Sequence, residues 1–190
     1  MKRKIGIFQY NSPVTLTFTL ISLAVLILGY ITKGVSTNLL FCTYKASLSN
    51  PLTYIRIFTH VLGHANWSHF SGNMVLFLVL GPMLEEKFGS KLFLEMIVIT
   101  AFISGIIFIF LYPDSALLGA SGIVFMMIVL SSAAGMEEGG IPITLILVVI
   151  VYLGGEVVNG MGNDDGIAHI VHIMGGVCGA AFGFIGRRRR

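Results

Sequence analysis

Charged side chains are scarce in this sequence, in which Asp, Glu, Lys and Arg together make up 11% of 190 residues. An ordinary soluble domain carries about 25% charged residues, so the deficit argues against a soluble enzyme of the usual type. A disordered chain is excluded as well, because 55% of the residues are hydrophobic. The mean hydropathy of +0.89 makes a membrane protein with several spanning helices the expected class.

Cysteine is scarce too, and the two that occur, Cys42 and Cys178, cannot form a disulfide framework. One lies in a polar stretch and the other in an apolar one, so we expect no bridge between them.

Seven of the twelve basic residues lie at the two ends of the chain. The net charge of +3 is therefore weak support for nucleic-acid binding, and no nucleic-acid partner is expected. Basic ends beside apolar segments are typical of the cytoplasmic flanks of membrane helices.

Apolar runs of about 20 residues, the length that a membrane-spanning helix needs, predict an all-α membrane protein with six spans in a single domain, residues 1–190. The expected spans are residues 14–31, 67–84, 91–111, 121–134, 142–158 and 167–186. The first run is too long for a signal peptide, and no small-residue cleavage site follows it. A long polar loop, residues 33–65, separates the first two spans, and its length indicates a structured or functional segment.

Six spans place both termini on the same side of the membrane. With this topology nine basic residues lie on the side of the termini and three on the opposite side. The positive-inside rule therefore predicts that both termini lie in the cytoplasm.

A few polar side chains interrupt the apolar runs, and each is costly within a membrane. They are His69 and Asn73 in the second expected span, Glu95 in the third, Ser121 at the start of the fourth, and His169 and His172 in the sixth. The even-numbered spans run in the same direction, so residue heights can be compared at about 1.5 Å per residue. His69, Asn73, Ser121 and His172 fall in one layer, roughly 10 Å below the outer surface.

This layer has the groups that acyl transfer requires. A serine hydroxyl becomes a nucleophile when a histidine within hydrogen-bonding distance takes its proton, which points to Ser121 and His172. The Ser121 N–H opens a helix and can donate to an oxyanion, and the Asn73 amide and His69 imidazole are suitable further donors. No carboxylate is placed to orient His172, so we expect a dyad and not a triad. The fourth run is too short to cross the membrane, so it must begin inside it, within protein or a water-filled cavity.

Small residues surround the expected dyad. They are Gly119 and Gly122 beside Ser121, and Gly175 and Gly179, which follow His172 in the pattern H-x-x-G-x-x-x-G. Small residues four apart let two membrane helices approach closely. We therefore expect these packing glycines to bring the fourth and sixth spans together.

Three motifs appear in order along residues 52 to 186. They are His60-x3-His64-x4-His69-x3-Asn73-Met74, then Gly119-Ala-Ser121-Gly122, then Ala168-His169-Ile-Val-His172-x2-Gly175-x3-Gly179. Together they resemble the rhomboid family of intramembrane serine proteases, in its minimal six-helix form, and Glu85 matches an acidic position at the inner end of the second helix. Two positions depart from the family pattern, since Phe125 replaces a common tyrosine and Ile55-Arg56 replaces a common Trp-Arg pair.

The resemblance implies a function as well as a fold. It makes Ser121 the nucleophile and His172 the general base, and it places His69 and Asn73 at the oxyanion hole. It implies single-span membrane proteins as substrates, cut in or near the outer part of their helix, and a multi-pass protein in the bacterial cytoplasmic membrane. The lipid bilayer is then the other expected partner, and no cofactor is expected.

Several alternatives compete with this interpretation. His169 rivals His172 as the base but lies one turn nearer the outer surface, and His60 and His64 lie in the first loop, where a structural role is expected. A metal site is disfavoured because no H-E-x-x-H occurs and no carboxylate or cysteine lies beside the histidines. The main alternative function is a rhomboid-like pseudoprotease that binds membrane clients, although pseudoproteases typically lack one of the two dyad residues. A transporter would need a polar path across the inner halves of the spans, which are almost wholly apolar.

Overall fold

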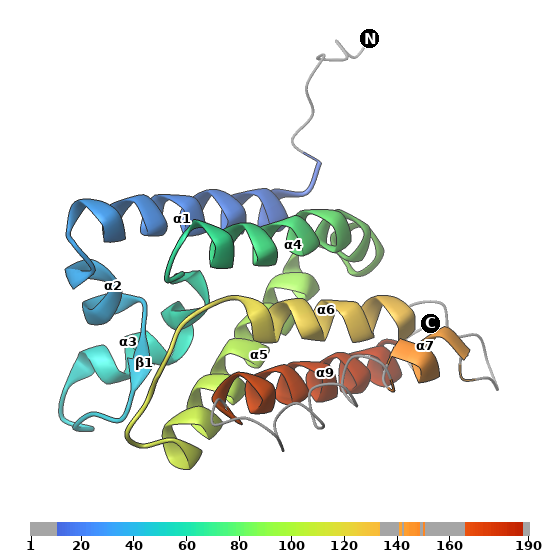
Figure 1. The fold of residues 1–190 in the computed structure, drawn as a ribbon. Helices are drawn as coiled ribbons and strands as arrows, with labels where there is room; N and C mark the ends of the chain where they lie inside the picture. Colours follow the sequence, from blue (N-terminus) through green and yellow to red (C-terminus); the bar gives the residue numbers. More distant parts are fainter. Residues whose placement is uncertain (1–10, 134–140, 142, 149, 151–165, 188–190) are drawn as a thin grey trace, which may run out of the picture.

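The computed structural model describes residues 11–133, 141, 143–148, 150 and 166–187, which form a helical bundle (Figure 1). The long helices are α1 (Pro13–Ile31), α4 (Trp67–Phe88), α5 (Ser90–Leu111), α6 (Ser121–Ala133) and α9 (Gly166–Arg187). The shorter elements are α2 (Val35–Leu40), α3 (Pro51–Thr59), the 3₁₀ turn η1 (His60–Leu62) and α7 (Ile143–Val148). Apart from one two-residue antiparallel pair, β1 (Thr43–Tyr44) with β2 (Ala116–Leu117), the described residues confirm the all-α class.

Five of the six expected spans coincide with long helices, of which α4 continues four residues further than expected, to Phe88. Most of the fifth expected span, residues 142–158, lies outside the described residues, as does Ala134 at the end of the fourth. Among the described residues, two helices, α1 and α5, are long and apolar enough to cross a membrane by length and composition. The count of six spans therefore stays a prediction.

The polar segment between the first two spans has regular structure of its own. It contains α2, α3, η1 and β1, and a local signal explains why α3 begins where it does. Asn50 caps the helix by accepting a hydrogen bond from the Leu52 N–H at 3.0 Å, and Pro51 occupies the first helical position, where its missing N–H costs nothing. The strand pair β1–β2 ties this segment to the chain that leads into α6.

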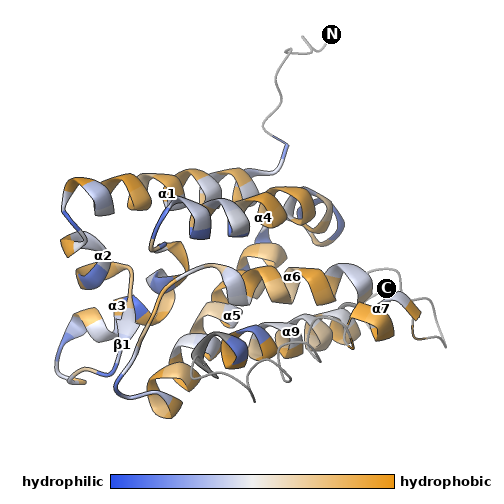
Figure 2. Cartoon of the chain, in the orientation of Figure 1, coloured by the Kyte–Doolittle hydropathy of each residue, from blue (hydrophilic) through white to orange (hydrophobic). Residues whose placement is uncertain are grey.

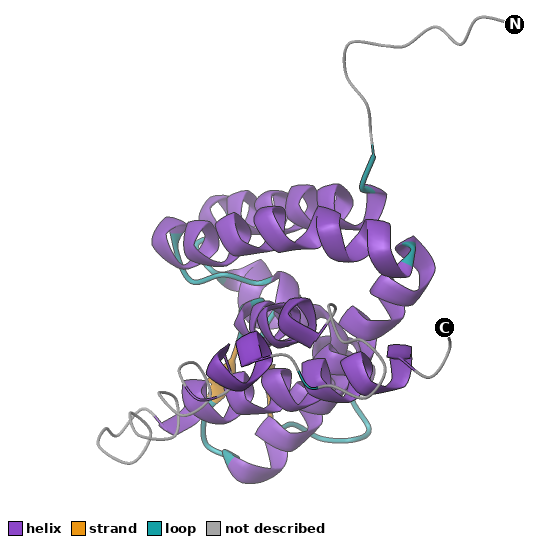
Figure 3. Cartoon of the chain, turned by 90° about the vertical axis from the view of Figure 1, so that its right-hand side faces the viewer, coloured by secondary structure: helices purple, strands orange, loops and turns teal. Residues whose placement is uncertain are grey.

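The long helices form two pairs joined by α5 (Figures 1 and 3). In the first pair α1 and α4 run antiparallel, because Phe18 stacks on Phe77 at 4.6 Å and Tyr30 stacks on Trp67 at 6.2 Å. The second pair is α6 and α9, and α5 packs against both of these helices as well as against α4. The arrangement places the start of α6 between α4 and α9.

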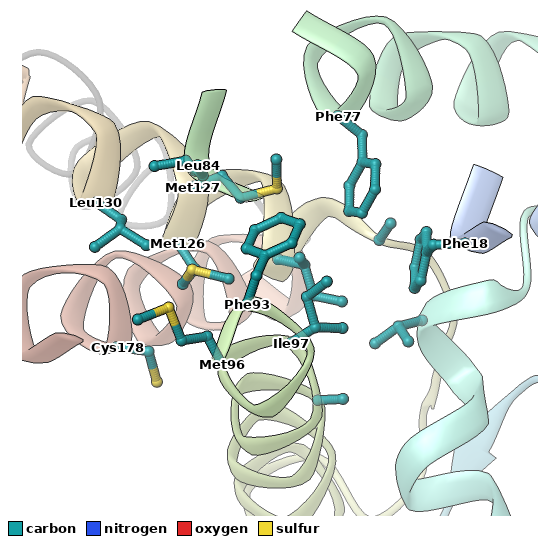
Figure 4. Close-up of a cluster of buried hydrophobic side chains, with 14 of the residues drawn as sticks. Phe18, Phe77, Leu84, Phe93, Met96, Ile97, Met126, Met127, Leu130 and Cys178 are labelled. Carbon is teal, nitrogen blue, oxygen red and sulfur yellow. The ribbon is translucent and has the colours of Figure 1, made fainter. Parts of the chain in front are cut away.

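The bundle is apolar both inside and outside. Its main core takes aromatic and sulfur-containing side chains from α1, α4, α5, α6 and α9, among them Phe77, Phe93 and Met126, which are fully buried (Figure 4). Large apolar side chains also lie on the outer helix faces, for example Val79, which is 67% exposed. Figure 2 shows hydrophobic residues along the length of the long helices. An apolar exterior of this kind suits a protein surrounded by lipid, where exposed Leu, Ile and Val meet hydrocarbon.

Glu85, near the end of α4, holds the start of α1. One carboxylate oxygen accepts from the Val14 N–H at 2.9 Å and the Ser90 hydroxyl at 2.7 Å. The other accepts from the N–H and the hydroxyl of Thr15, at 2.9 and 2.8 Å. The first N–H groups of a helix lack intrahelical acceptors, and a negative charge at this end is favoured. A buried carboxylate on one helix thus caps another helix about 70 residues away in sequence.

We expect Glu85→Gln to lower the free energy of unfolding by about 2–4 kcal/mol, because the amide presents a donor where two donors already point inward. Glu86→Gln is the matched control, since Glu86 is the exposed neighbour of Glu85. Thermal unfolding in detergent would measure both variants. Equal midpoints for the two would contradict the capping role.

Candidate active site

The two glycine motifs lie where α6 and α9 touch. A Cβ built on Gly175 would overlap the carbonyl oxygen of Gly122, and one built on Gly179 would overlap the carbonyl oxygen of Met126. The contacts advance along both helices in the same direction, so α6 and α9 run parallel with their backbones in close contact. Only glycine permits this approach, as the pattern of small residues predicted.

The same packing brings Ser121 and His172 to one level. Gly122 lies against Val171, the residue before His172. One turn after Ser121, the Phe125 ring stacks on the His172 imidazole with centroids 4.2 Å apart and planes 5° from parallel. Phe125, which replaces the common tyrosine of the family pattern, therefore packs face to face against the histidine. Ser121 and His172 are both half-buried, so each retains access to the surface.

The side chains from α4 approach from the opposite side of Ser121. Gly119 has a φ of +125°, a conformation that other residues adopt only with strain. A Cβ there would lie 2.7 Å from the His69 ring and 3.9 Å from the Asn73 amide nitrogen, Nδ2. The imidazoles of His69 and His172 are also near enough for their charges to interact. His69, Asn73, Ser121 and His172 therefore surround one small region, while their expected depth in the membrane stays a prediction.

Asn73 has an unusual hydrogen-bonding state. Its Nδ2 atom is buried and has no acceptor in the part of the chain that the structure describes. A buried donor without an acceptor is costly, and such groups are rare in folded proteins. An amide held beside Gly119 in this state can donate to an oxygen atom that arrives near Ser121.

Two histidines of the first motif support this region in ways that the sequence did not reveal. The His60 carbonyl oxygen accepts from the Gly119 N–H at 3.0 Å, which fixes the chain just before Ser121. The His64 ring packs edge-on against the His69 ring, with centroids 5.1 Å apart. These contacts are consistent with the structural role that was expected for both residues. The spacing of the histidines in the first motif was the sequence feature that could have indicated the contacts.

The remaining candidates lie apart or have other surroundings. Glu95 is exposed on α5, and His169 is half-buried on α9, three residues before His172. Cys42 and Cys178 are both buried and free. Over the residues described, no group of three or more His, Cys, Asp or Glu side chains is arranged to hold a metal ion.

The two loop histidines give the fold a pH dependence. Burial lowers the pKa of His60 to about 4, and burial together with the charge of His69 lowers the pKa of His64 to about 4. The folded state thus favours the neutral rings, while an unfolded histidine has a pKa of about 6.5. Their contribution to stability is complete above pH ~6.5 and is lost as the pH falls from there toward 4.

We therefore expect the unfolding midpoint of the wild type in detergent to fall as the pH is lowered from 7 to 4.5. His60→Gln should be less stable than the wild type at pH 7, because it loses the bond from Nδ1 to the Ile57 carbonyl oxygen, 3.0 Å long. Its midpoint should nevertheless change less between the two pH values. An unchanged pH slope in this variant would show that His60 is not among the groups responsible.

Two comparisons with known proteins give one consistent result. The family model for the rhomboid domain matches residues 51–189. A curated relative, the rhomboid protease GluP of Bacillus subtilis (strain 168), is 29% identical over 191 aligned residues. The alignment covers 95% of this chain and 37% of the relative, so the chain spans little more than a third of that protein's length. The chain belongs to the rhomboid family, which makes it an integral membrane protein.

Proposed function

We propose that the chain is an intramembrane serine endopeptidase that cleaves single-span membrane proteins through a dyad of Ser121 and His172. The stacked His172 ring, held at the level of Ser121 by glycine-to-glycine packing, is the observation that carries the proposal. The relative from Bacillus subtilis is called a rhomboid protease, which supports the same activity here. Ser121 and His172 are both retained, and this favours a protease over a pseudoprotease.

Each group has a defined part in the proposed reaction. His172 takes the proton of the Ser121 hydroxyl, and the oxygen attacks the carbonyl carbon of the scissile peptide bond. The resulting oxyanion accepts hydrogen bonds from the Ser121 N–H, the Asn73 amide and the His69 ring. His172 then protonates the leaving amine, and water, activated by the same imidazole, releases the acyl group from Ser121.

The position of the site suits a substrate that enters from the membrane. Ser121, His69 and His172 are only half-buried, so a peptide and a water molecule can reach them. A cavity of about 500 Å³ adjoins the region, lined in part by His64 and by Leu118, the residue before Gly119. We propose six spans with both termini in the cytoplasm, which places the site in the outer half of the membrane and explains cleavage near the outer end of a substrate helix.

The purified chain in detergent, mixed with a model single-span substrate, tests this proposal directly. The protease interpretation predicts two fragments from one cut in or near the substrate helix. Binding of the substrate without cleavage would favour the pseudoprotease. Neither binding nor cleavage, with a folded protein and several substrate sequences, would contradict both.

The oxyanion hole gives a graded prediction. Asn73→Ala should lower turnover by about 100- to 1,000-fold if the site depends on this donor, and by less if the other two share the charge. The defect should appear in kcat more than in KM, because the donor matters most in the transition state. His69→Ala should behave in the same way.

Steady-state kinetics with the model substrate would separate the two parameters. A rise in KM at unchanged kcat would contradict the assignment of these residues to the oxyanion. Asn11→Ala is a control, since Asn11 is an exposed amide just before α1 and does not line the cavity beside the site. It should leave both parameters unchanged.

A further inference from the structure

A groove of about 400 Å³ lies between α1 and α5, on a side of the molecule that the proposed reaction does not use. Apart from Thr17, every residue that lines it is apolar. Ile21 on α1 and Leu94 and Val98 on α5 are 45%, 48% and 43% exposed, so the groove opens at the surface of the protein. α1 and α5 are the two described helices that qualify as membrane spans, and a groove between them therefore faces lipid hydrocarbon.

The groove extends from the start of α1 and α5 toward α3. Pro13 at the start of α1 and Leu94 near the start of α5 lie at one end, where Glu85 holds the start of α1 beside that of α5. Phe58 of α3 and Val61 of η1 line the other end. An acyl chain that lies in the groove, with its headgroup at the membrane surface where α1 and α5 begin, would therefore extend toward Phe58 and Val61.

A positive charge lies near the end of the groove at which α1 and α5 begin. Lys91 is exposed and precedes Leu94 by three residues, so it is on the adjoining surface of α5, one turn nearer the membrane boundary. Glu95 is the nearest acidic residue on this helix, and the helical rotation of about 100° per residue places it further from the groove. Glu85 lies at the same end, but its carboxylate is buried and accepts four hydrogen bonds, so the exposed charge beside the groove is that of Lys91.

We propose that this groove holds one acyl chain of an anionic phospholipid as a resident ligand, with the phosphate of its headgroup at Lys91. Lipid tails surround the groove on the membrane side, and its apolar lining offers nothing to a polar ligand. Lipid tails are as apolar as the lining of the groove, so an acyl chain gains no hydrophobic free energy on entering it. Binding then depends on how well the chain packs against the groove. The charge of Lys91 adds a preference for an anionic headgroup, about fivefold for one lysine near the surface.

Two neighbouring residues on α5 give a matched test. Val98→Trp fills the groove, whereas Ile99→Trp adds the same ring at a position that is equally exposed, at 43%, and does not line the groove. Each protein is reconstituted in vesicles of equimolar phosphatidylglycerol and phosphatidylcholine, extracted in mild detergent and examined by native mass spectrometry. We expect the wild type and Ile99→Trp to retain one phosphatidylglycerol, and Val98→Trp to retain at least tenfold less.

Substitution of the lysine tests the headgroup separately. Lys91→Gln should retain a lipid but lose the roughly fivefold preference for phosphatidylglycerol, and Lys45→Gln, in the first loop, should keep it. Equal retention by Val98→Trp and Ile99→Trp would overturn the proposal, as would wild-type protein that carries no lipid. A dimer that Val98→Trp alone disrupts would assign the groove to a second copy of the chain instead. None of these measurements depends on proteolysis.

Discussion

Ser121→Ala is expected to lower cleavage of a model single-span substrate by about 10⁴-fold or more, because no other group can form the acyl intermediate. The change removes one half-buried hydroxyl at the start of α6 and leaves the glycine contacts with α9 in place. We therefore expect little change in the unfolding midpoint. Rates of fragment release and thermal unfolding, measured on the same preparation, would check both statements.

Ser132→Ala is the matched control, since Ser132 is also half-buried on α6, three turns further along. Its hydroxyl donates to the Ile128 carbonyl oxygen at 3.1 Å within the helix. We expect this variant to cleave at nearly the wild-type rate. Substantial cleavage by pure Ser121→Ala protein would contradict the serine mechanism.

His172→Ala should lower cleavage by a comparable factor, because Ser121 then has no base. The substitution also removes the stacking on Phe125, so a modest loss of stability, about 1 kcal/mol, is expected in addition. His169→Ala should affect stability more than turnover. Cleavage rates of the two variants, each corrected for the folded fraction, would distinguish the residues.

This pair of variants can also reverse the assignment. A folded His169→Ala protein without activity, together with a His172→Ala protein that still cleaves, would make His169 the base. The structure argues against that outcome, because the contacts of Phe125 and Gly122 place His172 and not His169 at the level of Ser121.

The grouping of the candidate site residues was largely predictable from the sequence, because a helix has a constant rise per residue. Sequence separation therefore gives distance along the helix axis. Counting about 1.5 Å per residue along parallel spans placed His69, Asn73, Ser121 and His172 in one layer, and the contacts of Gly119 and Phe125 agree with that register. The spacing of the glycines likewise predicted where α6 and α9 touch.

Contacts between residues far apart in the sequence were not predictable in this way. Periodicity describes one helix at a time, so nothing in it indicated that Glu85 caps α1 or that the His60 carbonyl oxygen holds Gly119. The strand pair beside the site is two residues long, too short for an alternating pattern to appear. Only the helix start at Asn50 and Pro51 had a readable local signal in the first loop.

A fluorophosphonate probe tests the central claim most directly, because it forms a covalent bond only with an activated serine. After reaction with the purified chain, intact mass and peptide mapping would locate the adduct. The account predicts one adduct, on Ser121, that disappears in His172→Ala and persists in His169→Ala. An adduct on another residue, or labelling of Ser121 that survives in folded His172→Ala, would contradict it.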